Sequence, residues 1–252
     1  MYKRQPQLWA ELEDANITLR EACGNTIRNV TASADAGVNP NELFDVSPYA
    51  HAFFEYFLRN PICQEMGRKF KVSFSSDDKD TAFSFMHDLG FIPRVQNGKK
   101  GFKVVVGGGL GAQPMLAHAL YEFLPIEEFL PLSEAVVRVF DRNGERASRG
   151  KARMKFLIKK IGFDAFKELI EEQKAACINK TYEVDESRAE LVGPADRTKF
   201  EVETPVNATQ YQAWLDTNVF EQKQAGFYGV YIKLPLGNIY NEKARAFAKI
   251  VE

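Results

Sequence analysis

The stretch from Met66 to Phe74 constrains this chain most, because it alternates like a strand yet carries two lysines on one face. Successive side chains of extended backbone point to opposite faces, so Lys69 and Lys71 are expected to share a face. The apolar residues expected on the other face are Phe70, Val72 and Phe74. Two ammonium groups on one face repel each other unless water or an anion lies beside them. The stretch therefore predicts either a solvated edge strand, where lysines discourage aggregation, or an anion-binding face.

The composition requires any anion site to be local. A net charge of −1 over 252 residues gives no general attraction to nucleic acid or to a membrane. The hydrophobic content of 45% can fill the core of one large domain or two small ones. No apolar run approaches the length of about 18 residues that spans a membrane, and the N-terminus lacks the apolar segment of a signal peptide. A soluble, cytoplasmic protein without a membrane or nucleic-acid partner is expected.

The cysteines do not predict a metal site. Cys23, Cys63 and Cys177 lie far apart and form no C-x-x-C pair. Their spacing indicates neither a disulfide framework nor a cluster site, so no metal ligand is assigned within this chain.

Hydrophobic periodicity and turn residues divide much of the chain into helices and strands. The Asn97-Gly98 pair predicts a tight turn between two strands, and Ser133 is the expected N-cap of a helix. The expected helices are residues 7–15, 49–60, 115–123 and 133–142. The expected strands are residues 69–74, a strand beginning at residue 90, and residues 101–106.

Small and polar residues surround two arginines in the segment 18–31, which has little apolar periodicity. The segment predicts a loop that leads into a turn or a helix start. Asn25 permits a tight turn, while Thr26 and Asn29 can cap or hydrogen-bond. Arg28 has two interpretations: a surface residue, as most loop arginines are, or a guanidinium that binds an oxyanion through two hydrogen bonds.

A glycine run follows the strand 101–106 and consists of Gly107, Gly108 and Gly109. Glycines in this place let backbone N–H groups approach a bound anion without a side chain in the way. The run lacks the lysine of a P-loop and the spacing of a dinucleotide-binding fold. An anion cradle and a sharp turn out of a sheet are both consistent with it.

A basic segment extends from Arg138 to Lys160, with nine basic side chains and two acidic ones. A helix is expected to begin within it. Arg149 and Arg153 are four residues apart, as are Lys151 and Lys155, so each pair would place like charges on one helix face. Such pairs are disfavoured unless an anion offsets them. A solvated face and a nucleic-acid surface are the alternatives, although the aromatic residues of a stacking platform are absent.

The C-terminal part predicts a linker and a small second unit. Residues 177–206 are polar and charged, and residues 207–252 contain an alternating strand at 226–237 and a helix at 241–251. One strand and one helix are too few to close a sheet around a core. The unit is therefore expected to pack on the first domain or to belong to a longer chain.

Four motifs, in this order, resemble the ferredoxin-type sulfite and nitrite reductases. They are E-A-C-G-N-T-I-R-N-V (21–30), R-K-F-K (68–71), G-F-K-V-V-V-G-G-G-L-G (101–111) and G-E-R-A-S-R-G-K-A-R-M-K (144–155). The resemblance implies an α+β fold, in which a mixed or antiparallel sheet flanked by helices binds sirohaem. The implied parts are a residual N-terminal helix or linker (1–17), the sirohaem-binding domain (18–176), a linker (177–206) and the start of a second ferredoxin-like half-domain (207–252).

The resemblance also implies roles for particular residues. The family binds its substrate anion on the distal face of the sirohaem, where positive side chains hold the anion and assist proton delivery. The matching residues for that role are Arg28, Lys69 and Lys71. Other residues match the regions of the family that hold the macrocycle and its carboxylates. They are Gly107, Gly108, Gly109, Arg149, Lys151, Arg153 and Lys155. Polar groups near the cofactor match Asn25, Thr26 and Asn29.

The chain departs from the family pattern in three places. Met66-Gly67 stands where the family usually has Leu-Pro, and both the N-terminal half-domain and the cluster motif, C-x5-C followed by C-x3-C, are missing. These absences imply an internal piece of a longer reductase, whose [4Fe-4S] cluster is held by residues outside this chain. The chain by itself is expected to be inactive.

The implied enzyme is an assimilatory sulfite reductase that reduces sulfite to sulfide with six electrons from ferredoxin or a similar donor. Sulfite-reducing members resemble this chain in having lysine at both positions of R-K-x-K, whereas nitrite-reducing members tend to have asparagine at the second. Lys71 therefore favours sulfite, which carries more negative charge than nitrite near neutral pH. A nitrite reductase of the same family and a non-catalytic anion- or RNA-binding module are the alternatives.

Overall fold

A five-stranded mixed sheet organises the first of two units, Met1–Val192 and Gly193–Glu252, in the computed structural model. The structure describes residues 4–15, 17–189, 207–237 and 239–251. The strands, in spatial order, are β1 (Ile27–Ala32), β2 (Phe70–Phe74), β3 (Leu89–Gln96), β4 (Lys99–Val106) and β5 (His118–Pro125). The pairs β1–β2 and β2–β3 are parallel, and the pairs β3–β4 and β4–β5 are antiparallel. The α+β class with a mixed sheet is thus confirmed.

Strand β2 lies inside the sheet, hydrogen-bonded to a neighbour on each side. Phe70 and Val72 are fully buried on one face, while Lys69 and Lys71 are only partly buried. The predicted alternation is confirmed, but the edge-strand interpretation of the lysines is wrong. Discouraging pairing at a sheet edge therefore does not explain them.

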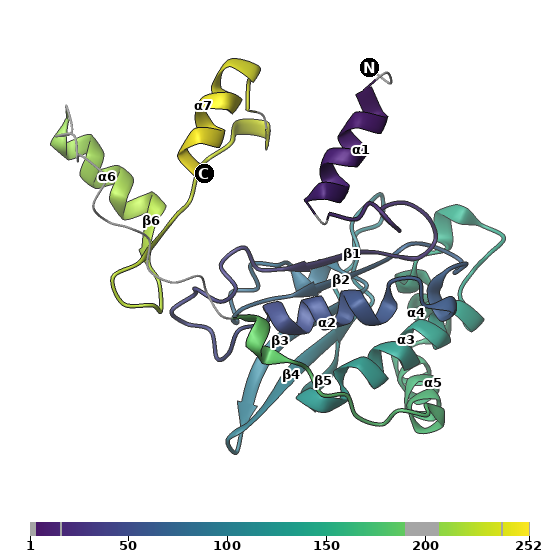
Figure 1. Cartoon of the computed structure of the whole chain (residues 1–252). Coiled ribbons are helices and arrows are strands. Elements are labelled where there is room, and N and C mark those ends of the chain that lie inside the picture. Colours follow the sequence, from purple (N-terminus) through teal and green to yellow (C-terminus); the bar gives the residue numbers. More distant parts are fainter. Residues whose placement is uncertain (1–3, 16, 190–206, 238, 252) are drawn as a thin grey trace. The chain divides into compact units, whose positions relative to one another are not determined.

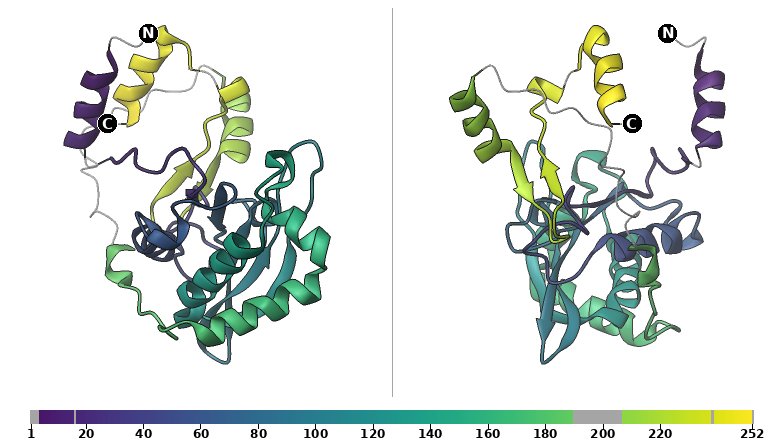
Figure 2. Two further views of the ribbon diagram at one scale, coloured as in Figure 1. Left: turned by 90° about the vertical axis from the view of Figure 1, so that its right-hand side faces the viewer. Right: turned by 60° about the vertical axis from the view of Figure 1, so that its left-hand side comes forward.

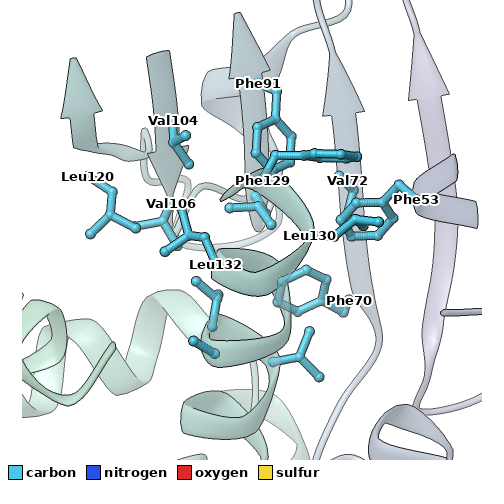
Figure 3. Close-up of a cluster of buried hydrophobic side chains, with 14 of the residues drawn as sticks. Phe53, Phe70, Val72, Phe91, Val104, Val106, Leu120, Phe129, Leu130 and Leu132 are labelled. Carbon is cyan, nitrogen blue, oxygen red and sulfur yellow. The ribbon is translucent and has the colours of Figure 1, made fainter. Parts of the chain in front are cut away.

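Helices cover the apolar face of the sheet, as Figures 1 and 2 show for α2 and α3. The helices of this unit are α1 (Gln5–Asp14), α2 (Ser47–Phe57), α3 (Phe129–Asn143), α4 (Met154–Ile161) and α5 (Phe163–Ala176). Phe53 of α2 and Phe129 of α3 pack with Phe91 of β3, at ring-centroid distances of 6.3 and 6.1 Å. Figure 3 shows this cluster continuing through Leu120 of β5. The opposite face of the sheet is the one that carries the lysines.

Three expectations about local structure are wrong. The predicted loop at 18–31 contains β1, because the parallel ladder to β2 overrides a polar local sequence. The predicted helix at 115–123 is largely strand β5, since its backbone pairs with β4. Ser133 is a buried residue inside α3 rather than its N-cap, and its hydroxyl donates to the Phe129 carbonyl at 2.5 Å.

The second unit is small. It contains α6 (Ala208–Asn218), a two-stranded antiparallel sheet of β6 (Val219–Glu221) and β7 (Tyr228–Val230), and α7 (Asn241–Val251). The helix predicted at 241–251 is confirmed, whereas the strand predicted at 226–237 is limited to β7. Among the residues described, no helix is both long and apolar enough to cross a membrane.

Candidate anion- and cofactor-binding site

Six basic side chains gather at the lysine-bearing face of β2. We call them the cationic cluster: Arg28, Arg68, Lys69, Lys71, Arg149 and Arg153. They come from β1, from β2 and the two residues before it, from the short 3-10 turn Arg149–Lys151 and from the residue that precedes α4. Segments more than 100 residues apart in the sequence therefore meet here.

The parallel pairing of β1 and β2 brings the first two motifs together. Asn29 lies opposite Lys71, and the register shifts between Ile27 and Asn29, where Arg28 is located. Just before the ladder, the Phe70 N–H donates to the Thr26 carbonyl at 2.9 Å. Arg28 and the two lysines are thus placed next to one another by backbone hydrogen bonds.

The loop before β1 is held by Glu21. Its carboxylate accepts hydrogen bonds from the Arg59 N–H at 2.7 Å, from the Gln64 side chain at 2.9 Å and from the Thr26 hydroxyl at 3.2 Å. Thr26 is buried and its hydroxyl is used within the protein, so its predicted contact with a cofactor would require this bond to change. Arg28 donates to the Ala22 carbonyl from Nε and Nη2, at 3.3 and 3.2 Å.

The basic side chains of the cationic cluster repel one another, and burial together with this repulsion lowers the pKa values of two of them. Partial burial lowers the pKa of Lys69, and the neighbouring charges of Arg28, Lys71, Arg68 and Arg153 lower it further. The pKa of Arg68 is also lowered by burial. The charges of three nearby arginines, Arg149, Arg153 and Arg28, lower this pKa further. In the described residues, Lys69 and Lys71 form no ion pair with a carboxylate, so an anion at this face would relieve the repulsion.

The basic segment is not one continuous helix. A 3-10 turn covers Arg149–Lys151, Arg153 is extended, and α4 begins only at Met154. The expected stacking of Arg149 on Arg153 and of Lys151 on Lys155 is therefore wrong. Both Arg153 and Lys155 instead point to partners far away in the sequence.

Arg153 and Lys155 are occupied by partners from within the chain. The Arg153 guanidinium donates to both carboxylate oxygens of Asp88, with three contacts between 2.8 and 3.1 Å. The Lys155 ammonium is buried and donates to the carbonyls of Gly109, Leu110 and Gln113 at 3.2, 3.1 and 2.6 Å. Burial lowers the pKa of Lys155, as does the charge of Arg153, while Asp88 opposes the shift.

The glycine run is required by close packing. A Cβ at Gly107 would lie 2.3 Å from Ile158 Cδ1, and one at Gly108 would lie 2.3 Å from the Phe85 carbonyl oxygen. The N–H groups of Gly107 and Gly109 donate to the carbonyls of Asp88 and Met115, at 2.8 and 2.9 Å. These two amides are therefore not available to an anion in this conformation.

Two residues of the site were missed from the sequence. Arg68 belongs to the R-K-F-K motif, but strand alternation singles out only the two lysines. Asp88 is 1% exposed and binds Arg153, which is 65 residues away. A single acidic residue before a strand gives no signal of such a partner.

The donor set fits a polycarboxylate cofactor better than a metal cluster. Arginines and lysines without carboxylate partners suit an anionic macrocycle such as sirohaem. Cys23 is exposed and Cys63 is buried, where its Sγ donates to the carbonyls of Phe57 and Asn60 at 3.3 Å. Within the described ranges no group of three or more His, Cys, Asp or Glu side chains could hold a metal ion.

Comparisons with known proteins show which proteins this chain resembles. The chain is 35% identical over 170 residues to "Sulfite reductase [ferredoxin] 1" of Mycolicibacterium paratuberculosis, covering 67% of this chain and 30% of that protein. It is 30% identical over 174 residues to the "Assimilatory ferredoxin-dependent nitrite reductase" of Haloferax mediterranei, again covering 67% of this chain and 30% of the relative. The chain thus spans less than a third of the length of these relatives.

Structural similarity extends further along the chain. The structure of the Mycobacterium tuberculosis NirA protein matches with a TM-score of 0.67 and 28% identity, covering 90% of this chain and 37% of that one. The family described as "Nitrite and sulphite reductase 4Fe-4S domain" matches residues 23–177. This match contains the sheet and the whole cationic cluster. The chain belongs to the nitrite and sulphite reductase 4Fe-4S domain family.

Proposed function

We propose that this chain supplies the anion-binding and sirohaem-binding part of an assimilatory sulfite reductase, which reduces sulfite to sulfide with six electrons from ferredoxin or a similar donor. The observation that carries the proposal is the cationic cluster, in which Lys69 and Lys71 have no carboxylate partner among the described residues and repel their neighbours. A face of this kind is stable with an oxyanion bound to it.

Arg28, Lys69 and Lys71 are proposed to bind the oxyanion. The lowered pKa of Lys69 makes its ammonium a readier proton donor than an ordinary lysine, and reduction of sulfite consumes protons. Sirohaem, when bound, supplies the electron-transfer chemistry. Its carboxylates would be held by arginines of the cluster and by Lys151, with Asn25, Thr26, Asn29 and the run Gly107, Gly108 and Gly109 nearby. Arg153 and Lys155 would bind the cofactor while keeping part of their hydrogen bonds to Asp88 and to the loop carbonyls.

The proposed division of the chain places the sirohaem-binding domain at residues 18–176 and the start of a second ferredoxin-like half-domain at 207–252. The [4Fe-4S] cluster of the family would be bound by cysteines outside this chain, because the cysteines present are scattered. The chain alone is then proposed to be inactive. Iron and acid-labile sulfide analysis of the purified protein tests this, and a stoichiometric cluster would contradict it.

A nitrite reductase of the same family is the second candidate, favoured by the 30% identity to the nitrite reductase of Haloferax mediterranei. The lysine at position 71 supports sulfite instead, since an added ammonium group favours the more highly charged anion. A nucleic-acid surface is the third possibility. The affinity of such a surface for nucleic acid would fall steeply with salt, and the surface would not discriminate between small oxyanions.

The proposal is tested by titrating the purified chain with sulfite, nitrite, chloride and a short RNA at two ionic strengths. Saturable binding of sulfite that is weakened by Lys69→Ala, but not by Lys159→Ala, is the expected result. Lys159 is the matched control because it is an exposed lysine of α4 outside the cluster. Tighter binding of RNA than of sulfite, or equal loss in both variants, would contradict the proposal.

A further inference from the structure

Asp88 is a buried carboxylate set against the cationic cluster. Its Oδ2 accepts the Lys71 N–H at 2.9 Å and Arg153 Nη2 at 2.8 Å, and its Oδ1 accepts Arg153 Nε and Nη2 at 3.1 and 2.8 Å. All four contacts are of hydrogen-bond length, and the pair with Arg153 has the fork geometry of a bidentate ion pair. The exposed fraction of Asp88 is only 1%. Water therefore contributes little to holding this charge.

The backbone of Asp88 connects the same segments. Its N–H donates to the Lys71 carbonyl at 3.1 Å, and its carbonyl accepts the Gly107 N–H at 2.8 Å. One residue thus joins β2, the end of β4 and the segment before α4. Both of the polar backbone groups of Lys71 are bonded to Asp88, one through the side chain and one through the main chain.

We propose that Asp88 is the positioning residue of the cationic cluster: it fixes the Lys71 backbone and neutralises Arg153, so that Lys69 and Lys71 remain directed to an oxyanion. The consequence for catalysis rests on the function proposed above, whereas the positioning itself does not depend on which substrate is bound. Without this carboxylate, Arg153 would add an uncompensated charge to a cluster that is already repulsive.

The charged surroundings set the direction of the expected effect. Lys69 faces Arg28, Arg68, Lys71 and Arg153, all of which disfavour its charged form. Burial raises the pKa of Asp88, while Arg153 and, more weakly, His87 oppose that shift, and Asp88 in turn acts on Lys155. Asp88 is linked to Lys69 through Arg153: without the carboxylate that pairs with it, the Arg153 charge acts on Lys69 unopposed, so protonated Lys69 becomes still less favourable.

The test is an NMR titration of the lysine ammonium groups in the 252-residue protein. In Asp88→Asn, which keeps the size of the side chain, the pKa of Lys69 is expected to fall below its value in the wild type. In the charge-balanced double variant Asp88→Asn/Arg153→Gln, the pKa of Lys69 is expected to be no lower than in the wild type, because the repulsive Arg153 charge is also gone. Asp78→Asn is the matched control, since Asp78 pairs with Arg94 at the surface and is 79% exposed.

An unchanged Lys69 pKa in Asp88→Asn would overturn the proposal, as would a fall of equal size in the double variant. If Asp88→Asn does not fold, recovery of folding in the double variant supports action through Arg153. Failure of both variants to fold would show that Asp88 has only a structural role and would overturn the proposal. The same samples are titrated with sulfite. A wild-type protein that does not bind sulfite refutes the proposed function, while the Lys69 pKa still decides the role of Asp88.

Discussion

Two basic segments of this protein look alike in sequence but differ in their surroundings. Lys71 on β2 and Lys69 just before it have no carboxylate partner among the described residues, whereas Arg153 is paired with Asp88 and Lys155 with three backbone carbonyls. Both segments repeat cations at short intervals. The difference teaches that a row of cations becomes a candidate anion site only where the fold provides no counter-charge, and this depends on tertiary contacts.

The largest expected effect comes from removing the ion pair between Arg153 and Asp88. Arg153→Met would leave Asp88 buried without its counter-charge, and loss of about 3–5 kcal/mol in the free energy of unfolding is expected. Urea unfolding measures it. Arg149→Met is the matched control, because Arg149 is exposed, and it should change stability by no more than about 0.5 kcal/mol. Equal effects of the two substitutions would show that Arg153 is not a buried partner.

Lys155→Met should have the next largest effect. It removes the donor shared by the carbonyls of Gly109, Leu110 and Gln113, and a hydrogen bond to a charged group is worth about 1.5–3 kcal/mol. The expected results are a loss of that size in urea unfolding and faster hydrogen exchange at the Gly109 amide. Lys159→Met, on the exposed side of α4, serves as the control. Unchanged exchange at Gly109 would mean that Lys155 does not hold the glycine loop.

On the unpaired side, Lys71→Asn tests substrate choice. Partial loss of a charge-assisted hydrogen bond should shift the ratio of kcat/KM for sulfite and nitrite by about tenfold toward nitrite in the full-length enzyme that we propose. Lys69→Ala is the companion variant, expected to weaken both reactions alike. A sulfite-to-nitrite ratio that does not change in Lys71→Asn would remove the main support for sulfite.

The smallest expected effect is the pH dependence of stability due to Lys69. Its pKa is lowered in the folded protein, so between the folded and unfolded pKa values the unfolded chain binds more protons, and stability rises with pH. Lys69→Met loses this contribution. The unfolding free energy of the wild type minus that of the variant should therefore increase as the pH rises from about 7 toward 10. A difference that is constant or decreases would contradict the repulsion.

Local patterns predicted the elements whose sequence and tertiary roles agree. The Asn97-Gly98 hairpin formed with both residues at positive φ, 52° and 75°, as a tight hairpin turn requires. The apolar face of β2 and the helix containing Phe53 were also predicted correctly. In each case the local propensity and the burial of the side chains favour the same structure.

Long-range pairing explains what local patterns missed. Residues 115–123 contain two alanines and two leucines, which favour a helix, yet the pairing of β5 with β4 makes most of this range a strand. The candidate site divides in the same way. Alternation in β2 placed Lys69 and Lys71 correctly on one face, but the spacing of Arg149, Arg153 and Lys155 gave the wrong arrangement, because a carboxylate and a loop elsewhere in the chain determine it.

The most direct measurement of the central claim is a titration of the chain with sulfite, followed through the Nζ resonances of its lysines. Saturable shifts at Lys69 and Lys71, with a rise in the pKa of Lys69 and no change at Lys159, are predicted because a bound anion offsets the repulsion within the cationic cluster. Equal shifts at all exposed lysines, or no shift at Lys69 and Lys71, would contradict the claim that this face of β2 is an anion site.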